Sequence, residues 1–131
     1  MNIKFLFIQV KVIVAGGCNG WCKLNPPVAS AELYDPATDT WTKLPDMPYP
    51  ISSSKMEQVN GYPTVIGGVT EDFTKKSNMV QTGILQSYDP DTNRWFVPLD
   101  ATEGNSGSLK IPRSNHAVLQ IPKYFVPSCF I

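Results

Sequence analysis

Val12-Ile13-Val14-Ala15-Gly16-Gly17 is an apolar run that ends in a pair of glycines. Further along, a short segment ends in Tyr34-Asp35-Pro36, and Trp41 follows seven residues after Tyr34. The same order returns as Thr64-Val65-Ile66-Gly67-Gly68, then Tyr88-Asp89-Pro90 and Trp95. The two tyrosines and the two tryptophans are each 54 residues apart, and Gly16 and Gly67 are 51 apart. A period of this length indicates that the chain contains two copies of one structural repeat.

The marks of this repeat resemble those of the kelch family. The structural motif positions that carry the resemblance are Gly16, Gly17, Tyr34, Trp41, Gly67, Gly68, Tyr88 and Trp95. The resemblance covers about residues 10–126, and it implies an all-β fold of antiparallel four-stranded blades that form part of a β-propeller. A closed propeller uses about four to eight such blades. We therefore expect a fragment of about two and a half blades, too short to close a ring by itself.

The repeat divides the chain into successive parts. Residues 1–9 are predicted to be an irregular or truncated start, residues 10–48 the first and incomplete kelch repeat, and residues 49–98 the second. A polar insertion loop at 99–112 precedes the start of a third, truncated repeat at 113–131, which lacks the glycine pair, the tyrosine and the tryptophan.

Local patterns predict the strands within these parts. The apolar run 10–15 is typical of a strand that is buried on both faces. Further strands are predicted at 29–35, 40–44, 52–59, 62–66, 83–89, 94–97 and 113–121. Asn60-Gly61 favours a tight hairpin, and Asp35 and Asp89 each begin a turn in which the carboxylate accepts a backbone N–H two residues on. Residues 69–82 are predicted to be a long loop.

The motif residues should serve the packing of the blades. Both glycine pairs are expected at strand ends, where backbone angles closed to other residues are needed. Trp41 and Trp95 are expected to be buried between blades, because a fixed place in the repeat favours a core role over ligand stacking. The outer faces of the first and third blades, with Val12, Val14, Val118 and Phe125, should stay uncovered and promote self-association.

Composition limits the classes of partner. The 131 residues hold 11 basic and 11 acidic side chains, so the net charge is zero and nucleic acid is not an expected partner. Gln9 and Lys11 interrupt the N-terminal apolar run, which argues against a secretory signal, a membrane span or a membrane partner, and weakly favours the cytoplasm. Cys18 and Cys22 are interpreted as free loop thiols, with a small disulfide as the alternative.

The sequence offers no clear catalytic chemistry. The single histidine, His116, is interpreted as a packed strand residue, and no catalytic residue, metal ligand or cofactor is expected. The resemblance implies a protein-interaction scaffold or adaptor that binds a protein partner through inter-strand loops at 18–28, 49–54, 69–82 and 100–112. Trp21 and Phe73 are the candidate partner-binding residues. The alternative is a fragment of a galactose-oxidase-like or other propeller enzyme whose catalytic residues lie outside this chain.

Overall fold

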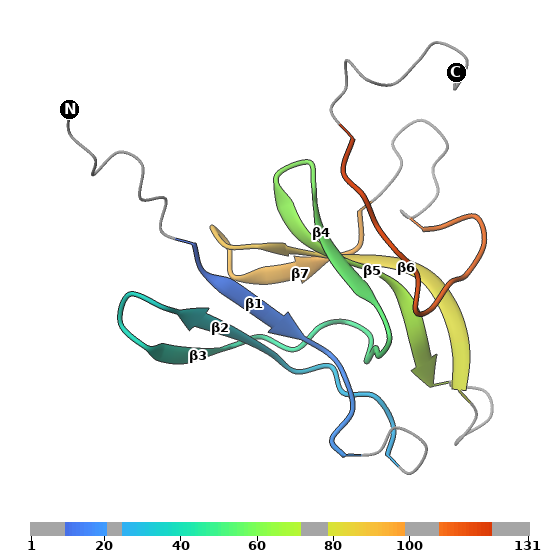
Figure 1. Cartoon of the computed structure of the whole chain (residues 1–131), viewed down its shortest axis with the longest axis horizontal. Coiled ribbons are helices and arrows are strands. Elements are labelled where there is room, and N and C mark those ends of the chain that lie inside the picture. Colours follow the sequence, from blue (N-terminus) through green and yellow to red (C-terminus); the bar gives the residue numbers. More distant parts are fainter. Residues whose placement is uncertain (1–9, 21–24, 72–78, 99–107, 122–131) are drawn as a thin grey trace.

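The computed structural model describes residues 10–20, 25–71, 79–98 and 108–121, and in this part of the chain all regular structure is β-strand. The strands are β1 (Val12–Ala15), β2 (Ala31–Asp35), β3 (Thr40–Leu44), β4 (Lys55–Val59), β5 (Tyr62–Glu71), β6 (Met79–Asp89) and β7 (Arg94–Phe96). They form two antiparallel sheets, one of order β1-β2-β3 and one of order β4-β5-β6-β7 (Figure 1). The all-β prediction with antiparallel blades is confirmed, and the two sheets do not close into a barrel or ring.

The hydrophobic core lies between the two sheets. One face of the first sheet contributes buried Ala31 and Leu44, with Ile13, Ala15 and Leu33 packed beside them. The second sheet contributes Tyr88, Val65, Met56 and Trp95 to the same core. The linker that joins the sheets adds Met47 and Ile51. Because each sheet has two faces, this single contact buries one face of each sheet and leaves the other face of β1–β3 without a second sheet.

Three hairpin turns follow the predicted chemistry. The amide of Ala37 donates to Asp35 Oδ1 at 3.0 Å, and the amide of Asp91 donates to Asp89 Oδ1 at 2.9 Å, as expected for aspartate at the first turn position. Asn60 and Gly61 both have positive φ, at 51° and 83°, which is the pattern of a type I′ turn. The backbone of these turns was therefore predictable from the sequence.

The glycine pairs differ from expectation in their place along the strands. Gly16 and Gly17 follow the end of β1, whereas Gly67 and Gly68 lie inside β5, where the register shifts at a bulge between Ile66 and Gly68. The prediction that both pairs end a strand is thus wrong for the second pair. The ladder resumes beyond the bulge, from Gly68↔Thr82 to Glu71↔Met79, so the predicted loop 69–82 is strand at both its ends. The β-branched residues that follow the bulge suit a strand.

Two further predictions about burial and strand formation are wrong. Val12 and Val14 of β1 are 44% and 47% exposed, so this strand is buried on one face only. Within residues 108–121, only Ser108 makes a ladder contact, an isolated bridge to Ile84, so 113–121 is not a strand there. Single hydrogen bonds hold this segment against the second sheet in place of a continuous ladder, one of them from Gln120 Nε2 to the Gln58 carbonyl.

Cys18 is disulfide-bonded, so the interpretation of a free thiol at this position is wrong. The other two cysteines, Cys22 and Cys129, lie outside the described residues. An isolated bridge between Cys18 and Pro27 draws the two sides of the β1–β2 connection together at its base.

Candidate functional site

The connections of an antiparallel sheet alternate between its two ends, so the strand order assigns each loop to one of two rims. The turns 36–39, 60–61 and 90–93 lie at one rim, called here the turn rim. The connections that follow β1, β3, β5 and β7 lie at the other, called here the loop rim; its described residues are 16–20, 25–30, 45–54 and 108–116. Figure 1 shows this segregation of tight turns from longer loops. The described residues of these connections therefore gather at one end of the sheets.

Each glycine pair contacts a segment of the loop rim that leads into the next part of the chain. The amide of Gly17 donates to the carbonyl of Ile51 at 2.7 Å, and the amide of Gly68 donates to the carbonyl of Arg113 at 2.7 Å. All four glycines have positive φ, between 61° and 114°. A Cβ on Gly67 would lie 2.8 Å from the Arg113 carbonyl oxygen, so only glycine permits this approach. Arg113 therefore stands where Ile51 stands one repeat earlier.

Arg113 occupies in the second repeat the position that Ile51 occupies in the first, so the chemistry of the rim differs between the two repeats. Ile51 is completely buried against the first sheet, whereas Arg113 is exposed. Within the described residues the Arg113 guanidinium makes no hydrogen bond or ion pair. The backbone beneath it is fixed, because the amide of Asn115 donates to the Ser53 carbonyl at 2.9 Å and the Arg113 carbonyl accepts from Gly68. The Arg113 guanidinium, which is unpaired within the described residues, is thus attached to a backbone that is held in place.

Polar residues lie on the two segments that meet beside Arg113. Ser53 and Asn115 are both exposed and both have positive φ, at 55° and 50°, and Ser54 is partly buried beside them. The hydroxyl and amide groups of such residues can donate to or accept from a bound peptide. Sequence reasoning missed this arrangement, because the segments 52–54 and 113–116 are far apart in the chain and meet only through the two sheets. The recurrence of a proline before each of Ile51 and Arg113 was the available signal.

His116 lies beneath the rim, against the second sheet. A Cβ on Gly67 would lie 3.1 Å from His116 Cε1, so the ring packs directly on the glycine pair. Both ring nitrogens are buried, and neither has a hydrogen-bond partner among the residues that the structure describes. The structure places His116 as a packed residue, close to the predicted role, although not on a strand.

The linker between the sheets is held by two side chains of the second sheet. Trp95 Nε1 donates to the carbonyl of Pro45 at 2.8 Å. Gln86 is completely buried; its Oε1 accepts the Tyr49 amide at 2.9 Å, and its Nε2 donates to the Tyr49 carbonyl at 3.2 Å. Because one amide side chain satisfies both backbone groups of Tyr49, the linker has a fixed path onto the loop rim. Trp95 is partly buried in this contact, as its predicted core role requires.

Trp41 does not share this environment, and its predicted burial is wrong. It is 56% exposed, and its ring lies against Tyr34 on the far side of the first sheet, with ring centroids 4.8 Å apart. The reason is that the described residues place no second layer on that face. The two candidate partner-binding residues, Trp21 and Phe73, lie outside the described residues.

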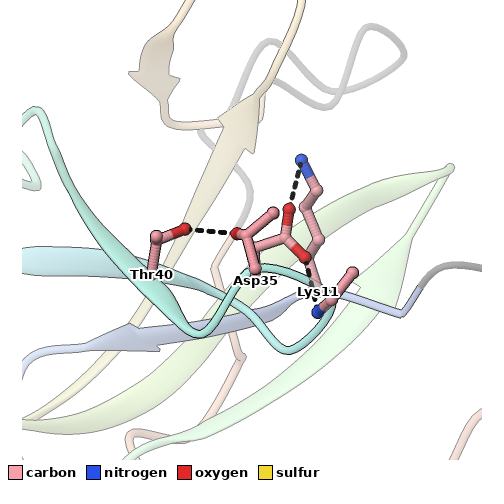
Figure 2. Close-up of polar contacts among 5 residues, drawn as sticks. Lys11, Asp35 and Thr40 are labelled. Carbon is pink, nitrogen blue, oxygen red and sulfur yellow. Dashed lines mark hydrogen bonds and ion pairs between the residues drawn. The ribbon is translucent and has the colours of Figure 1, made fainter.

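The turn rim carries a small polar cluster that is structural in character. Figure 2 shows Lys11, Asp35 and Thr40 at the first hairpin: Lys11 Nζ lies 3.6 Å from Asp35 Oδ2, while the other carboxylate oxygen caps the turn. The Thr38 and Thr40 hydroxyls are 2.6 Å apart. At the tip, the Tyr34 hydroxyl donates to Asp39 Oδ1 at 2.9 Å, and this bond raises the pKa of Tyr34. One oxygen of Asp35 is thus engaged by its own turn and the other by Lys11.

Within the described residues, no three His, Cys, Asp or Glu side chains gather in a way that could hold a metal ion. A groove of about 390 Å³ lies between the sheets, lined by Lys11, Val12, Ile13, Met56, Glu57, Gln58 and Pro63. No helix in the described part of the chain is long and apolar enough to cross a membrane.

Comparison with known proteins supports the repeat. Residues 7–48 match the Kelch motif. Kelch-like protein 35 of Mus musculus is 30% identical over 94 residues, which is 72% of this chain and 15% of that protein. Beta-scruin of Limulus polyphemus is 33% identical over 69 residues, which is 53% of this chain and 8% of that protein. This chain thus spans only a small part of the curated relatives that it matches.

A solved structure matches the fold itself. The structure of YjhT superposes with a TM-score of 0.53 and 24% identity, over 69% of this chain and 35% of that one. A likeness at this identity speaks for the fold alone. Together with the paired glycine corners, the recurring tyrosine and tryptophan and the Kelch motif at 7–48, it leads to one conclusion. The chain belongs to the kelch-repeat β-propeller family.

Proposed function

We propose that this chain is part of a protein-interaction scaffold or adaptor that is non-catalytic by itself, and that the loop rim binds its partner. The kelch-repeat relatives support a scaffold in general terms. The observation that carries the specific proposal is the exposed guanidinium of Arg113, which has no partner within the described residues and projects from a backbone fixed by Gly68 and Ser53.

The chemistry of the rim favours an acidic, extended segment of a partner protein. An arginine binds a carboxylate with two parallel hydrogen bonds, which adds geometric selectivity to the attraction of charge. Ser53 and Asn115 lie on the same rim and are exposed, so they can pair with the backbone groups of an extended peptide. A rigid backbone beneath these side chains lowers the entropy lost when a partner binds.

The test uses peptides selected for binding to the chain from a random displayed library. We expect the selected peptides to be enriched in Asp and Glu, and Arg113→Ala to weaken the binding of a selected peptide by roughly tenfold or more, in line with about 1.5–3 kcal/mol for a hydrogen bond to a charged group. Arg94→Ala is the matched control, because Arg94 is also exposed but begins β7 at the turn rim. Added salt should weaken binding to the wild type more than to Arg113→Ala. Selected peptides without acidic enrichment, or equal losses for both variants, would contradict the proposal.

A further inference from the structure

Two strands of the second sheet run past the others as a ribbon. β4 and β7 pair only with the halves of β5 and β6 that lie nearest the turn rim, whereas β5 and β6 continue together as far as Glu71↔Met79 (Figure 1). On the β5 side, Ser52 forms a bridge to Val69. On the β6 side, residues 79–81 have no neighbouring strand within the described part of the chain. This part of β6 is therefore an open edge of the sheet.

The backbone of this edge points outward. Val69 exchanges two hydrogen bonds with Ser52, at 2.9 and 2.8 Å, so its N–H and C=O point away from β6. In an antiparallel ladder, the residue opposite such a position also turns its backbone groups to its own outer side. Gln81 lies opposite Val69, so its N–H and C=O face outward, where no described residue bonds to them. Gln81 thus offers a donor and an acceptor to an added strand.

The first repeat has a proline at the equivalent place. Val28 and Thr82 correspond to each other, because each carbonyl accepts an amide from the segment that contacts the glycine pair, at 3.2 and 3.4 Å. The preceding residues, Pro27 and Gln81, are therefore equivalent as well, and they are 54 residues apart, the spacing of the two tyrosines. Pro27 is buried and has no N–H. Because proline on an edge strand prevents pairing with another chain, the edge is blocked in the first repeat and open in the second.

The side chains along the open edge are apolar at one end and basic at the other. Met79 and Val80 are 40% and 39% exposed. The edge ends at Arg113, whose amide donates to the Thr82 carbonyl, and Lys110 of the same segment is also exposed. Neither cation forms an ion pair within the described residues. A strand that suits this edge is therefore apolar beside Met79 and Val80, and acidic where it reaches the two cations.

We propose that the open edge at residues 79–81 takes an added β-strand from the partner segment that Arg113 binds, so that this inference rests on the proposed function. The backbone of the segment exchanges hydrogen bonds with Gln81, and its apolar side chains pack on Met79 and Val80. Its carboxylates pair with Arg113 and Lys110. Main-chain pairing of this kind requires an extended polypeptide, because the backbone groups of a helix are already bonded within the helix.

Gln81→Pro and Gln81→Ala are the matched variants for the test, which measures the affinity of the full chain for peptides selected from the displayed library. Gln81→Pro introduces the residue that the first repeat already has and removes the N–H from the edge, so it should weaken binding by roughly fivefold or more. Gln81→Ala keeps the N–H and should leave the affinity within about twofold of the wild type. Equal effects of the two variants would overturn the inference.

A second measurement needs no altered protein, and it applies even where Gln81→Pro does not fold. Successive N–H groups of an added strand point alternately toward β6 and away from it. Methyl groups on the backbone nitrogens of one alternate set of peptide residues should weaken binding by roughly tenfold or more, and those on the other set by less than about threefold. Equal losses from both sets, or no loss from either, would overturn the inference.

The same experiments separate this inference from the proposed function. If Arg113→Ala weakens binding while Gln81→Pro and N-methylation do not, the partner binds the loop rim without adding a strand, and the inference falls. If Gln81→Pro weakens the binding of selected peptides that have no acidic enrichment, the added strand is supported and the acidic partner of Arg113 is contradicted. Self-association of the chain that Gln81→Pro abolishes, without peptide binding, would assign the edge to a second copy and overturn the inference.

Discussion

Gly68→Ala tests the idea that the glycine pairs exist to let other segments of the chain approach the backbone closely. Gly68 has φ +114° and lies at the bulge of β5. An added Cβ would lie 2.5 Å from the Ser52 carbonyl oxygen, 2.9 Å from Ile51 Cγ1 and 3.0 Å from Ser54 Cβ. The nearest of these atoms belongs to backbone, so the methyl group cannot be accommodated by a side chain that simply rotates away.

The cost has two sources. Holding an alanine at this positive φ costs about 1–3 kcal/mol. Moving the Ser52 carbonyl disturbs the paired hydrogen bonds between Ser52 and Val69, at 2.9 and 2.8 Å, each worth about 0.5–1.5 kcal/mol net. The free energy of unfolding should therefore fall by roughly 2–6 kcal/mol.

Gly17→Ala is the matched control. Gly17 occupies the same place in the first repeat, has φ +99° and donates to the Ile51 carbonyl as Gly68 donates to the Arg113 carbonyl, but nothing lies within 4 Å of its added Cβ. Gly17→Ala should introduce only the backbone strain, so its free energy of unfolding should fall by about 1–3 kcal/mol. Urea unfolding followed by circular dichroism measures both variants. Equal midpoints would show that steric approach is not what the second glycine pair provides, and would refute the argument.

Three further outcomes are expected. Trp95→Phe should lower the free energy of unfolding by about 1–2 kcal/mol, because the hydrogen bond to the linker is lost. Trp41→Phe should change the free energy of unfolding by less than about 0.5 kcal/mol. Urea titration checks both variants, and similar losses would contradict the difference in burial. Gln86→Glu should destabilise the chain more at pH 8 than at pH 4, because only the protonated carboxyl can still donate to the Tyr49 carbonyl. Thermal melts at the two pH values measure this difference, and equal losses of stability would contradict this account. Burial raises the pKa of Tyr88 above the ordinary 10.0, so its contribution to stability is complete below pH 10 and is lost as the pH rises through the raised pKa. Ultraviolet titration should show late ionisation of both Tyr34 and Tyr88, and Tyr88→Phe should remove one of these two late-ionising groups.

The local structure of the repeat could be predicted from short stretches of the sequence. Asp35 and Asp89 cap their own turns, and Asn60-Gly61 adopts positive φ at both residues, because these conformations depend on atoms within a few residues of one another. The recurring spacing of tyrosine and tryptophan likewise predicted two antiparallel hairpins, and the structure pairs Tyr34 with Trp41 and Tyr88 with Trp95. The kelch resemblance followed from that spacing.

Which copies of the motif are buried, and which distant segments meet, depends instead on how the two sheets pack. Trp41 and Trp95 have the same local sequence pattern, but one face is covered by a sheet and a linker while the other is open, and burial depends on that neighbour. Arg113 and Ser53 are brought onto one rim by the packing of the second sheet, and the buried amide of Gln86 finds its partner 37 residues away at Tyr49. Contacts of this kind arise between elements distant in the chain, so no local pattern specifies them.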